Sequence, residues 1–415
     1  MKILTFCAYY EPEIAASMYL LTNLFEDAAN SGIEVDLYAP TPTRGVDKDT
    51  IQKYKHKKKE ILCNNNLNIN RFAMIQEGKN TIGRALRYIL VNGAFLWKGL
   101  HADADVLFVD STPPTQGLVA ALLKKVKKIP VVYNLQDIFP DSLVNTGICS
   151  KNSIFFKIGS WIEQITYRNA DKIIVISEDF KKNIISKGVP ENKIEVVYNW
   201  VDGECVNYIE KKDNQLFDEF CLDREKFYVS YSGNIGLTQN MELLIQAAVQ
   251  LQNIDDIGFV VIGDGAYKEE LQRQIIEKNL KNITLIPFQP YTRISEVFSV
   301  GDVGLIISKP GIGTNSVPSK TWSYMAAERP LLASFDLKSE LSQIISTNQC
   351  GESIRPDDCE CLVKTILKMK ENPLKLREQG NKGRKFVDRN LKRAIGTGRY
   401  IKCIEKSIDL WKMRK

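Results

Sequence analysis

The strongest constraint on the fold of this chain is a repeated alternation of short apolar runs with amphipathic segments. The apolar runs are typical of strands buried on both faces, and the segments between them have the spacing of amphipathic helices. Such repeats indicate a parallel, doubly wound α/β sheet with helices on both faces. In the first half of the chain, strands are predicted at 2–9, 34–39, 68–72, 106–110, 131–135, 172–176 and 194–197. Helices are predicted at 16–30, 81–100, 115–127, 154–168 and 178–187.

A second series of the same kind follows a polar stretch. Its strands are predicted at 227–232, 258–262, 283–286, 303–307 and 331–333, and its first helices at 240–252, 267–278 and 294–299. A chain of 415 residues is too long for one ordinary core, so two or three domains are expected from its length. The predicted division is an N-terminal domain 1–202, a linker and lead-in 203–226, a second domain 227–394, and a C-terminal helix 395–415 packing back toward the N-terminal domain. Two such domains facing a central cleft would bind ligands beyond the carboxyl ends of their strands.

Composition excludes several classes of protein. Hydrophobic content of 44% and charged content of 26% are those of a soluble globular chain, and no run reaches the roughly 18 apolar residues of a membrane span. The first residues start like a signal peptide, but Glu11 and Glu13 interrupt the pattern, so we interpret them as the first strand of a mature cytoplasmic protein. Nine cysteines without a Cys-x-x-Cys pair and only two histidines argue against a disulfide framework, a metal centre and a histidine-based triad.

The net charge of +6 is concentrated in lysine clusters at 53–59 and 124–128. Such clusters can be solvated surface, or they can bind anionic lipid or nucleic acid. Aromatic residues do not interleave with these lysines as they do on an RNA-binding sheet. We therefore favour lipid and expect no nucleic-acid partner.

The predicted helix 81–100 combines apolar and aromatic bulk with the cations Arg84, Arg87 and Lys98. This composition suits an interfacial helix that dips into a membrane surface. A helix buried in the core would explain the apolar positions equally well. The first alternative predicts peripheral association with the inner leaflet of the cytoplasmic membrane.

Residues 312–330 form the stretch with the strongest chemical signal. They follow the apolar run 303–308, and the start of a helix is marked by Ser316, Pro318 and Ser319. A helix that starts in this way aims free backbone N–H groups and a partial positive charge at whatever precedes it, which suits a phosphate. Lys320 lies in the first turn, where a cation is unfavourable unless an anion is near. Alternatively, Lys320 simply faces water.

Glycines follow two predicted strands of the second domain. Gly233 and Gly236 come directly after strand 227–232, and Gly263 and Gly265 come after the next strand. Glycines here allow backbone N–H groups to approach a phosphate closely, although glycines also serve tight turns. Together with the stretch around Lys320, three strand ends in one domain are predicted to meet an anionic ligand.

These motifs together resemble those of the retaining, GT-B-fold glycosyltransferases of family 4. The resemblance extends over nearly the whole chain and rests on the segments 170–178, 193–202, 231–236, 261–265 and 317–330. Segment 133–142 is similar to the bacterial, fucosamine-transferase-like branch that builds colanic-acid-type and O-antigen polysaccharides. The resemblance implies retaining transfer of a hexosyl or N-acetylhexosaminyl group from a nucleotide diphosphate sugar, with a UDP-sugar as the expected donor. The implied acceptor is a lipid-linked or growing saccharide of capsule or O-antigen biosynthesis, and no cofactor or metal is implied.

The resemblance assigns roles in donor binding to individual residues of this chain. Gly233 and Gly236 match the loop that faces the donor's diphosphate. Asn234 and Gln239 stand in that loop, where many members have an arginine and a lysine. Lys320 then becomes the main residue expected to neutralise the diphosphate, with Gly263, Gly265, Ser316 and Ser319 beside it.

Two family glutamates are replaced in this chain. Asn315 and Ser323 stand at their positions, so the resemblance implies that Asn315 contacts sugar hydroxyls and Ser323 contacts the ribose. Glu328 stands where a glycine is usual. Pro287 and Phe288 match the segment whose backbone meets the nucleobase.

In the first domain, Gln136 stands where the family often has a histidine, next to Asp137. The resemblance implies that these two residues orient the sugar or acceptor, with Ala15 and Ala16 on the same side. Asp137 joins Lys320 and Asn315 as a candidate catalytic residue. Alternatively, Asp137 caps the segment that follows it, a role that aspartate fills well.

Loss of both glutamates leaves two other functions open. A non-catalytic GT-B partner subunit would bind the nucleotide sugar without transferring it. A GT-B nucleotide-sugar epimerase would need additional acid and base groups, which the chain does not offer at these positions.

Overall fold

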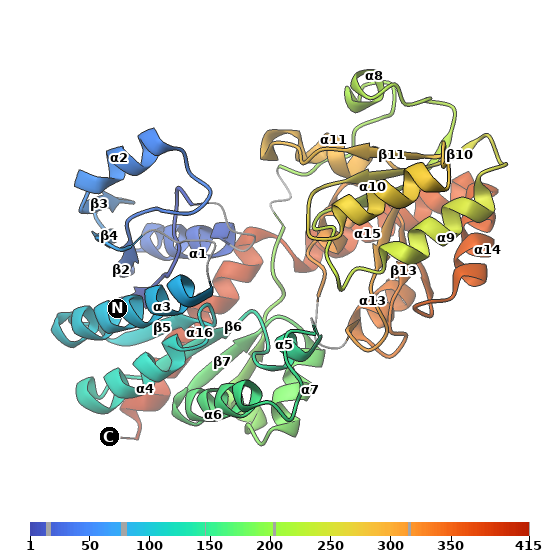
Figure 1. Ribbon diagram of the computed structural model, residues 1–415. Helices are drawn as coiled ribbons and strands as arrows, with labels where there is room; N and C mark the ends of the chain where they lie inside the picture. Colours follow the sequence, from blue (N-terminus) through green and yellow to red (C-terminus); the bar gives the residue numbers. More distant parts are fainter. Residues whose placement is uncertain (14–17, 76–80, 146, 202–204, 314–316, 415) are drawn as a thin grey trace. The chain divides into compact units, whose positions relative to one another are not determined.

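A computed structural model describes residues 1–414 apart from 14–17, 76–80, 146, 202–204 and 314–316. The chain forms two compact units (Figure 1). Unit 1 contains Met1–Tyr198 and Ala394–Lys415, and unit 2 contains Asn199–Arg393. Each unit is a parallel sheet with helices on both faces, so the α/β fold class predicted from the alternation is confirmed.

Unit 1 is built on an eight-stranded sheet with the order β3-β4-β2-β1-β5-β6-β7-β8. Neighbouring strands run parallel except for β3 and β4, which pair antiparallel. The strands are β1 (Lys2–Phe6), β2 (Glu34–Pro40), β3 (Lys59–Leu62), β4 (Leu67–Phe72), β5 (Val106–Asp110), β6 (Val131–Leu135), β7 (Lys172–Val175) and β8 (Ile194–Val196). Strands β5, β6 and β7 are buried at every residue because helices cover both faces of the sheet.

The helices of unit 1 divide between the two faces of its sheet. They are α1 (Met18–Asn30), α2 (Lys48–His56), α3 (Thr81–His101), α4 (Gln116–Lys127), α5 (Asp141–Asn145), α6 (Ile154–Asn169), α7 (Glu178–Ser186) and α16 (Arg393–Lys412). The crossovers through α3, α4 and α6 all lead in one direction along the sheet, and right-handed crossovers place these helices on one face. Phe25 of α1 and Tyr400 of α16 both contact Phe108 of β5, from the other face.

Unit 2 contains a six-stranded parallel sheet with the order β11-β10-β9-β12-β13-β14. Its strands are β9 (Phe227–Ser232), β10 (Ile257–Ile262), β11 (Ile283–Ile286), β12 (Val303–Ile307), β13 (Leu331–Ser334) and β14 (Gly351–Ile354). From β9 the chain proceeds outward through β10 to β11, and from β12 it proceeds the other way to β14. The order therefore reverses between β9 and β12, and ligands of such sheets bind at the carboxyl ends of the strands beside this switch point.

The helices of unit 2 surround this sheet. They are α8 (Leu216–Glu219), α9 (Met241–Leu251), α10 (Lys268–Glu277), α11 (Ile294–Ser299), α12 (Lys320–Ala326), α13 (Glu340–Asn348), α14 (Cys359–Lys370) and α15 (Pro373–Asn390). Within the ranges that the structure describes, no helix of either unit combines the length and the apolar composition needed to span a membrane.

The structure differs from the predicted organisation in three places. Helices α2, α5 and α8 and strands β3 and β14 were not predicted. Of these, α2 has no buried residue, and β3 is mostly exposed. The described part of the predicted linker 203–226, residues 205–226, belongs to unit 2. Leu216 and Phe217 are buried, and the Lys211 ammonium lies 2.7 Å from an Asp302 carboxylate oxygen. The C-terminal helix, predicted from residue 395, begins at Arg393.

Candidate functional site

The loops after β9 and β10 meet Lys320 at the switch point of unit 2. Gly233 directly follows β9 with a φ of 127°, and a Cβ added there would lie 3.4 Å from Lys320 Nζ. Gly263 directly follows β10 with a φ of 149°, and its added Cβ would lie 2.0 Å from the carbonyl oxygen of Gly233. Only glycine combines this backbone conformation with so close an approach. The structure thus brings three of the predicted site residues into one cluster.

The rest of the loop after β9 is held by its own side chains. The Gly236 N–H donates to Gln239 Oε1 at 3.1 Å, and the Tyr231 hydroxyl donates to the carbonyl of Asn234 at 2.6 Å. A Cβ on Gly265 would lie 2.4 Å from the carbonyl oxygen of Ile235. Gln239 therefore shapes the loop from within, whereas the Asn234 side chain is exposed.

Lys320 is a cation without a countercharge in the described part of the chain. Its Nζ lies over the ring of Tyr231, 3.4 Å from the ring centroid, in a cation–π contact. The described residues include no carboxylate that forms an ion pair with Lys320, and removal from water lowers the pKa of its ammonium group well below the ordinary value. An anion that enters this site would pair with the ammonium group of Lys320 and raise its pKa back toward the ordinary value.

Packing of α12 on the sheet fixes the position of Lys320. The Tyr324 hydroxyl donates to the carbonyl of Ser230 in β9 at 2.8 Å. The ring of Tyr324 lies on Gly304 of β12, where an added Cβ would come within 2.4 Å of a ring carbon. Trp322 stacks on Phe386 of α15 with 6.0 Å between the ring centroids. These contacts hold the first turn of α12 at the carboxyl end of the sheet.

Asp336, which follows β13, organises the loop between β12 and α12. Its two carboxylate oxygens accept hydrogen bonds from the N–H groups of Gly311 at 3.1 Å and Gly313 at 2.7 Å. At the start of the same loop, the Lys309 N–H donates to the carbonyl of Thr238 at 3.0 Å. Sequence reasoning missed Asp336; the available signal was an acidic residue just beyond a buried strand.

Serine hydroxyls with no protein partner lie near Lys320. Ser319 and Ser323 flank it on the same short helix, and their hydroxyls make no hydrogen bond with the described residues. Ser308, directly after β12, is buried and its hydroxyl also lacks a partner among them. Asn315 and Ser316 lie outside the described residues. Of these three serines, Ser319 is exposed, Ser323 is partly buried and Ser308 is buried.

The other predicted donor residues lie along the sheet. Pro287 and Phe288 follow β11, two strands away from β9, and the Phe288 side chain is 72% exposed. Glu328, at the position where a glycine is usual, has a φ of 55°. This left-handed conformation favours glycine and costs other residues about 1 kcal/mol or more.

In unit 1, Gln136 belongs to a polar network inside the protein. Its Nε2 donates to Asn134 Oδ1 at 3.0 Å and to the Tyr400 hydroxyl at 3.3 Å. Asn134 Nδ2 in turn donates to Asp110 at 2.8 Å, and all of these residues lie near the carboxyl ends of β5 and β6. The Gln136 amide nitrogen is therefore engaged within unit 1.

The other predicted residue of this region is Asp137. It is exposed and accepts a hydrogen bond from the Ser142 side chain, which is not the bond to a backbone N–H two or three residues on by which an aspartate caps a helix. Ala15 and Ala16 lie outside the described residues.

Stability should depend on pH through Asp110, whose burial raises the pKa of its carboxyl to about 7. The folded state binds a proton at Asp110 more tightly than the unfolded state does. The stability from that proton is fully present below about pH 4 and is lost as pH rises through about 7, by no more than about 1.4 kcal/mol per pH unit. The variant Asp110→Asn should lack this component when urea unfolding is compared at pH 5 and pH 8. An unchanged difference between the two pH values would contradict the assignment.

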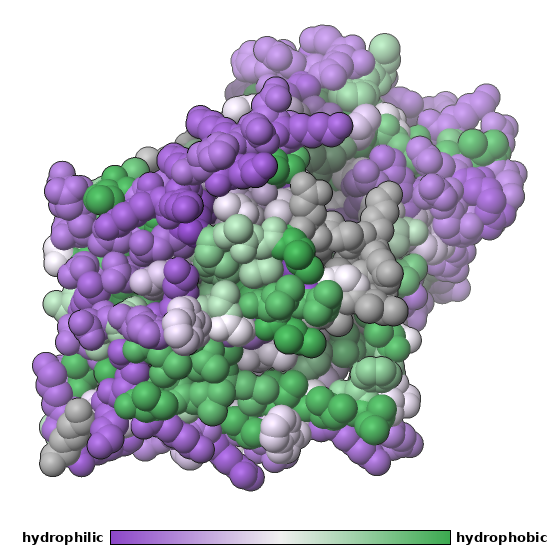
Figure 2. All heavy atoms as spheres, turned by 60° about the vertical axis from the view of Figure 1, so that its left-hand side comes forward, coloured by the Kyte–Doolittle hydropathy of each residue, from purple (hydrophilic) through white to green (hydrophobic). Residues whose placement is uncertain are grey.

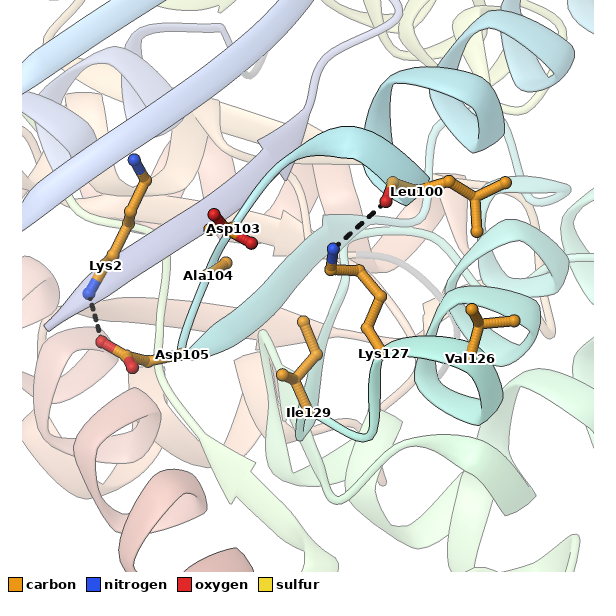
Figure 3. A pocket seen from close by; sticks show the side chains of 8 residues that line it. All are labelled: Lys2, Leu100, Asp103, Ala104, Asp105, Val126, Lys127 and Ile129. Carbon is orange, nitrogen blue, oxygen red and sulfur yellow. Dashed lines mark hydrogen bonds between the residues drawn. The ribbon is translucent and has the colours of Figure 1, made fainter.

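Unit 1 contains a cavity of about 450 Å³ by the amino ends of β1 and β5 (Figure 3). This end of the sheet is opposite to the carboxyl ends of the strands, where Gln136 lies. The Lys2 N–H donates to Asp105 at 2.7 Å, and Lys127 Nζ reaches the carbonyl of Leu100 at 3.3 Å. Because ligands of doubly wound sheets bind at the carboxyl ends of the strands, this cavity is distinct from the candidate site.

Two family models match the chain. Residues 19–204 match Glycosyltransferase Family 4, and residues 213–386 match Glycosyl transferases group 1. WbjE of Pseudomonas aeruginosa, named as a glycosyltransferase, is 25% identical over 72% of this chain and 74% of its own. WcaI of Escherichia coli K12, named as a colanic acid biosynthesis glycosyl transferase, is 25% identical over 65% of this chain and 66% of its own.

A third relative comes from Campylobacter jejuni and is 27% identical over 33% of this chain and 35% of its own. It is named N-acetylgalactosamine-N,N'-diacetylbacillosaminyl-diphospho-undecaprenol 4-alpha-N-acetylgalactosaminyltransferase.

Among solved structures, HepE of Anabaena superposes with a TM-score of 0.72 at 15% identity, covering 98% of this chain and 99% of its own. Sucrose-phosphate synthase of Thermosynechococcus elongatus superposes with a TM-score of 0.74 at 15% identity, covering 99% of each chain. With two successive family domains on two doubly wound sheets, the chain belongs to the GT-B-fold glycosyltransferases, with a family 4 domain followed by a group 1 domain.

Proposed function

We propose that this glycosyltransferase moves a sugar from a UDP-sugar to a lipid-linked saccharide in cell-surface polysaccharide biosynthesis, with retention of the anomeric configuration. The observation that carries the proposal is the cation of Lys320 against the glycine loops at the switch point of unit 2. A nucleotide diphosphate supplies the negative charge that this cluster lacks. The glycines, which have no side chains, leave room for the diphosphate to approach the backbone beside Lys320 closely.

The comparisons support the donor, the acceptor and the biosynthetic role in this proposal. HepE, which shares the fold, has been crystallised in complex with UDP and glucose. WcaI is named for colanic acid biosynthesis, and the name of the Campylobacter relative gives its acceptor as a saccharide linked to diphospho-undecaprenol. A lipid-linked acceptor puts the reaction at a membrane, and we propose that the protein associates peripherally with the cytoplasmic face.

The proposed reaction needs no nucleophile from the protein. The acceptor hydroxyl forms a bond to the anomeric carbon on the face from which the diphosphate departs, and the diphosphate oxygen takes the hydroxyl proton. The products are the glycosylated acceptor and the nucleoside diphosphate. Protein groups contribute by holding the reactants in position and by stabilising the charge on the departing diphosphate.

Roles follow from this reaction. Lys320 stabilises the diphosphate, because the N–H groups of Gly233, Ile235 and Gly236 already donate to Ile262, Asp264 and Gln239. The exposed ring of Phe288 stacks on the base. Asn315 contacts sugar hydroxyls, and Asp137 orients the acceptor. We expect activity without a resident metal ion, because Lys320 supplies the positive charge, and activity should persist in a chelator.

Thermal shift with UDP-, GDP- and dTDP-sugars tests the donor site. A ligand that binds only the folded state stabilises it by about 2.7 kcal/mol at a concentration of 100 Kd. UDP-sugars should raise the melting temperature, and the Lys320→Ala variant should respond much less. If no nucleotide sugar shifts the wild-type protein, the proposed donor site is wrong.

A second candidate function is favoured by the serine at position 323. Without the family's glutamates at 315 and 323, the chain could bind a nucleotide sugar as a non-catalytic partner subunit. Wild-type protein that binds a UDP-sugar but neither hydrolyses it nor transfers its sugar to lipid-linked saccharides would favour this function. Transfer that is lost in Lys320→Ala would exclude it.

The variant Asp336→Ala should weaken nucleotide binding about tenfold or more. It removes two hydrogen bonds to a charged acceptor, each worth about 1.5–3 kcal/mol, that hold the loop before Lys320. Calorimetric titration with UDP measures the loss. Asp336→Asn keeps one acceptor oxygen and should retain an intermediate affinity. Equal affinities for all three proteins would mean that the loop does not contribute to nucleotide binding.

A further inference from the structure

Helices α3, α4 and α6 lie side by side and present one continuous outer surface on unit 1. Small residues bring them close together. A Cβ added to Gly117 of α4 would lie 1.9 Å from the Thr166 side chain of α6, and one added to Gly99 of α3 would lie 2.5 Å from Leu123 of α4. We call the outer face of these helices the three-helix surface.

On α3, the three-helix surface carries a stripe of large apolar side chains. Val91 and Phe95 point into the core and are buried, whereas Leu86, Ile89, Leu90 and Trp97 are exposed. Ile89 is 69% exposed and Trp97 is 65% exposed. Helix α3 thus has one face buried in the core and one exposed apolar face.

Helices α6 and α4 continue the stripe. On α6, Ile154, Phe155, Ile158 and Trp161 are exposed with the spacing of one helix face, and Phe155 is 71% exposed. On α4, Leu122 and Val126 are exposed one turn apart. Figure 2, which brings forward the side of Figure 1 where α3 and α4 lie, shows hydrophobic side chains gathered in a broad band. An apolar area of this extent indicates an interaction site.

The charges on these helices have one sign. The residues of α3 and α4 include no aspartate or glutamate, and α6 has only Glu163. Glu163 is buried and lies 2.7 Å from the Lys187 ammonium. Lys98, Lys125 and Lys157, one on each helix, form no ion pair with the part of the chain that the structure describes. Arg87, predicted as a surface cation, is instead buried beside Tyr9.

We propose that the three-helix surface docks on an anionic lipid bilayer. Apolar side chains enter the boundary between headgroups and acyl chains, and lysines beside them reach the lipid phosphates. Trp97 and Trp161 suit this depth, because tryptophan prefers the membrane–water interface. Uncompensated positive charge favours anionic lipid over a second copy of this chain, which would bring like charges together. The inference deepens the proposed function, since a lipid-linked acceptor lies in a membrane.

Vesicle sedimentation without donor or acceptor tests the surface separately from the donor site. Wild-type protein should sediment with vesicles of equal parts phosphatidylglycerol and phosphatidylcholine, and much less with phosphatidylcholine alone. The double variant Trp97→Gln/Phe155→Gln should lower the partition coefficient at least tenfold, since two large apolar side chains no longer enter the lipid. Lys125→Glu/Lys157→Glu should do the same, because each lysine near the surface contributes about fivefold.

The matched control is Ile276→Gln/Leu374→Gln, which removes two equally exposed apolar side chains from unit 2. It should bind vesicles as the wild type does. The proposal is overturned if the wild type does not bind anionic vesicles or if the control loses binding as the surface variants do. It is also overturned if gel filtration shows a dimer that the same surface variants dissociate, since a second copy of the chain then covers the surface. UDP-sugar binding is unaffected in each of these outcomes, so failure here leaves the donor proposal standing.

Discussion

Replacement of Lys320 with methionine is expected to abolish sugar transfer while making the protein more stable. Methionine fills a similar volume over the Tyr231 ring without the cost of removing a charge from water. The melting temperature should rise, with a gain of about 1 kcal/mol. Transfer should fall about 100-fold or more, as is typical when a group that stabilises departing charge is removed.

The stability gain has a predicted pH dependence. The folded-state pKa of Lys320 is lowered, so the unfolded chain binds the proton more tightly. Wild-type stability therefore falls as pH drops from the ordinary lysine pKa of about 10.4 through the folded value. The gain in stability from Lys320→Met should be full at pH values below the folded-state pKa of Lys320. It should vanish above about pH 10.4. Calorimetric melting at several pH values measures it.

Lys309→Met provides the matched control for this prediction. Lys309 lies at the start of the same loop, but its side chain is exposed. Its replacement should leave both the melting temperature and the transfer rate nearly unchanged. Equal losses of transfer in the two variants would assign the effect to general loop charge and not to Lys320.

The second large effect is expected from Gly263→Ala. The new methyl group would lie 2.0 Å from the carbonyl oxygen of Gly233, and neither atom can move without disturbing the ends of β9 and β10. This clash and the positive φ together are expected to lower the free energy of unfolding by about 3 kcal/mol or more. Urea unfolding measures the loss, and UDP binding should disappear because the two loops no longer meet Lys320.

Gly188→Ala separates the clash from the backbone conformation. Gly188 has a φ of 89°, but no atom lies within 4 Å of an added Cβ. The free energy of unfolding of this variant should fall by only about 1–2 kcal/mol, the usual cost of a left-handed conformation for alanine. If Gly263→Ala is no more destabilised than Gly188→Ala, the contact between the two loops is not as close as the structure has it.

Most of the fold could be predicted because buried parallel strands have a simple pattern. Strands β10 and β12 are apolar along their length, β9 is interrupted only by Ser230 and Ser232, and all three are buried at every residue. Helix α2 and strand β3 have no such pattern, since they lie on the surface and bury little. Strand β14 was missed because only its last residue is buried.

The candidate site was predictable where a residue type is required by backbone geometry. Gly233 and Gly263 stand where a positive φ and a close approach exclude other residues. Asp336 was not predictable, because its partners are backbone N–H groups more than twenty positions away. The engagement of Gln136 with Tyr400 was hidden for the same reason, as α16 belongs to the other end of the chain.

The sequence by itself determined the two α/β units, the glycine loops and the presence of Lys320 at the start of a helix. These features are local, because strand burial, backbone conformation and helix starts are encoded within a few residues. Only the tertiary structure decided that Lys320 lies against Gly233 and Tyr231 with no carboxylate of the described residues paired to it. The same holds for the apolar, positively charged face that α3, α4 and α6 share. Both depend on the order of strands in a sheet, which brings distant segments together and decides which side chains of a helix remain outside.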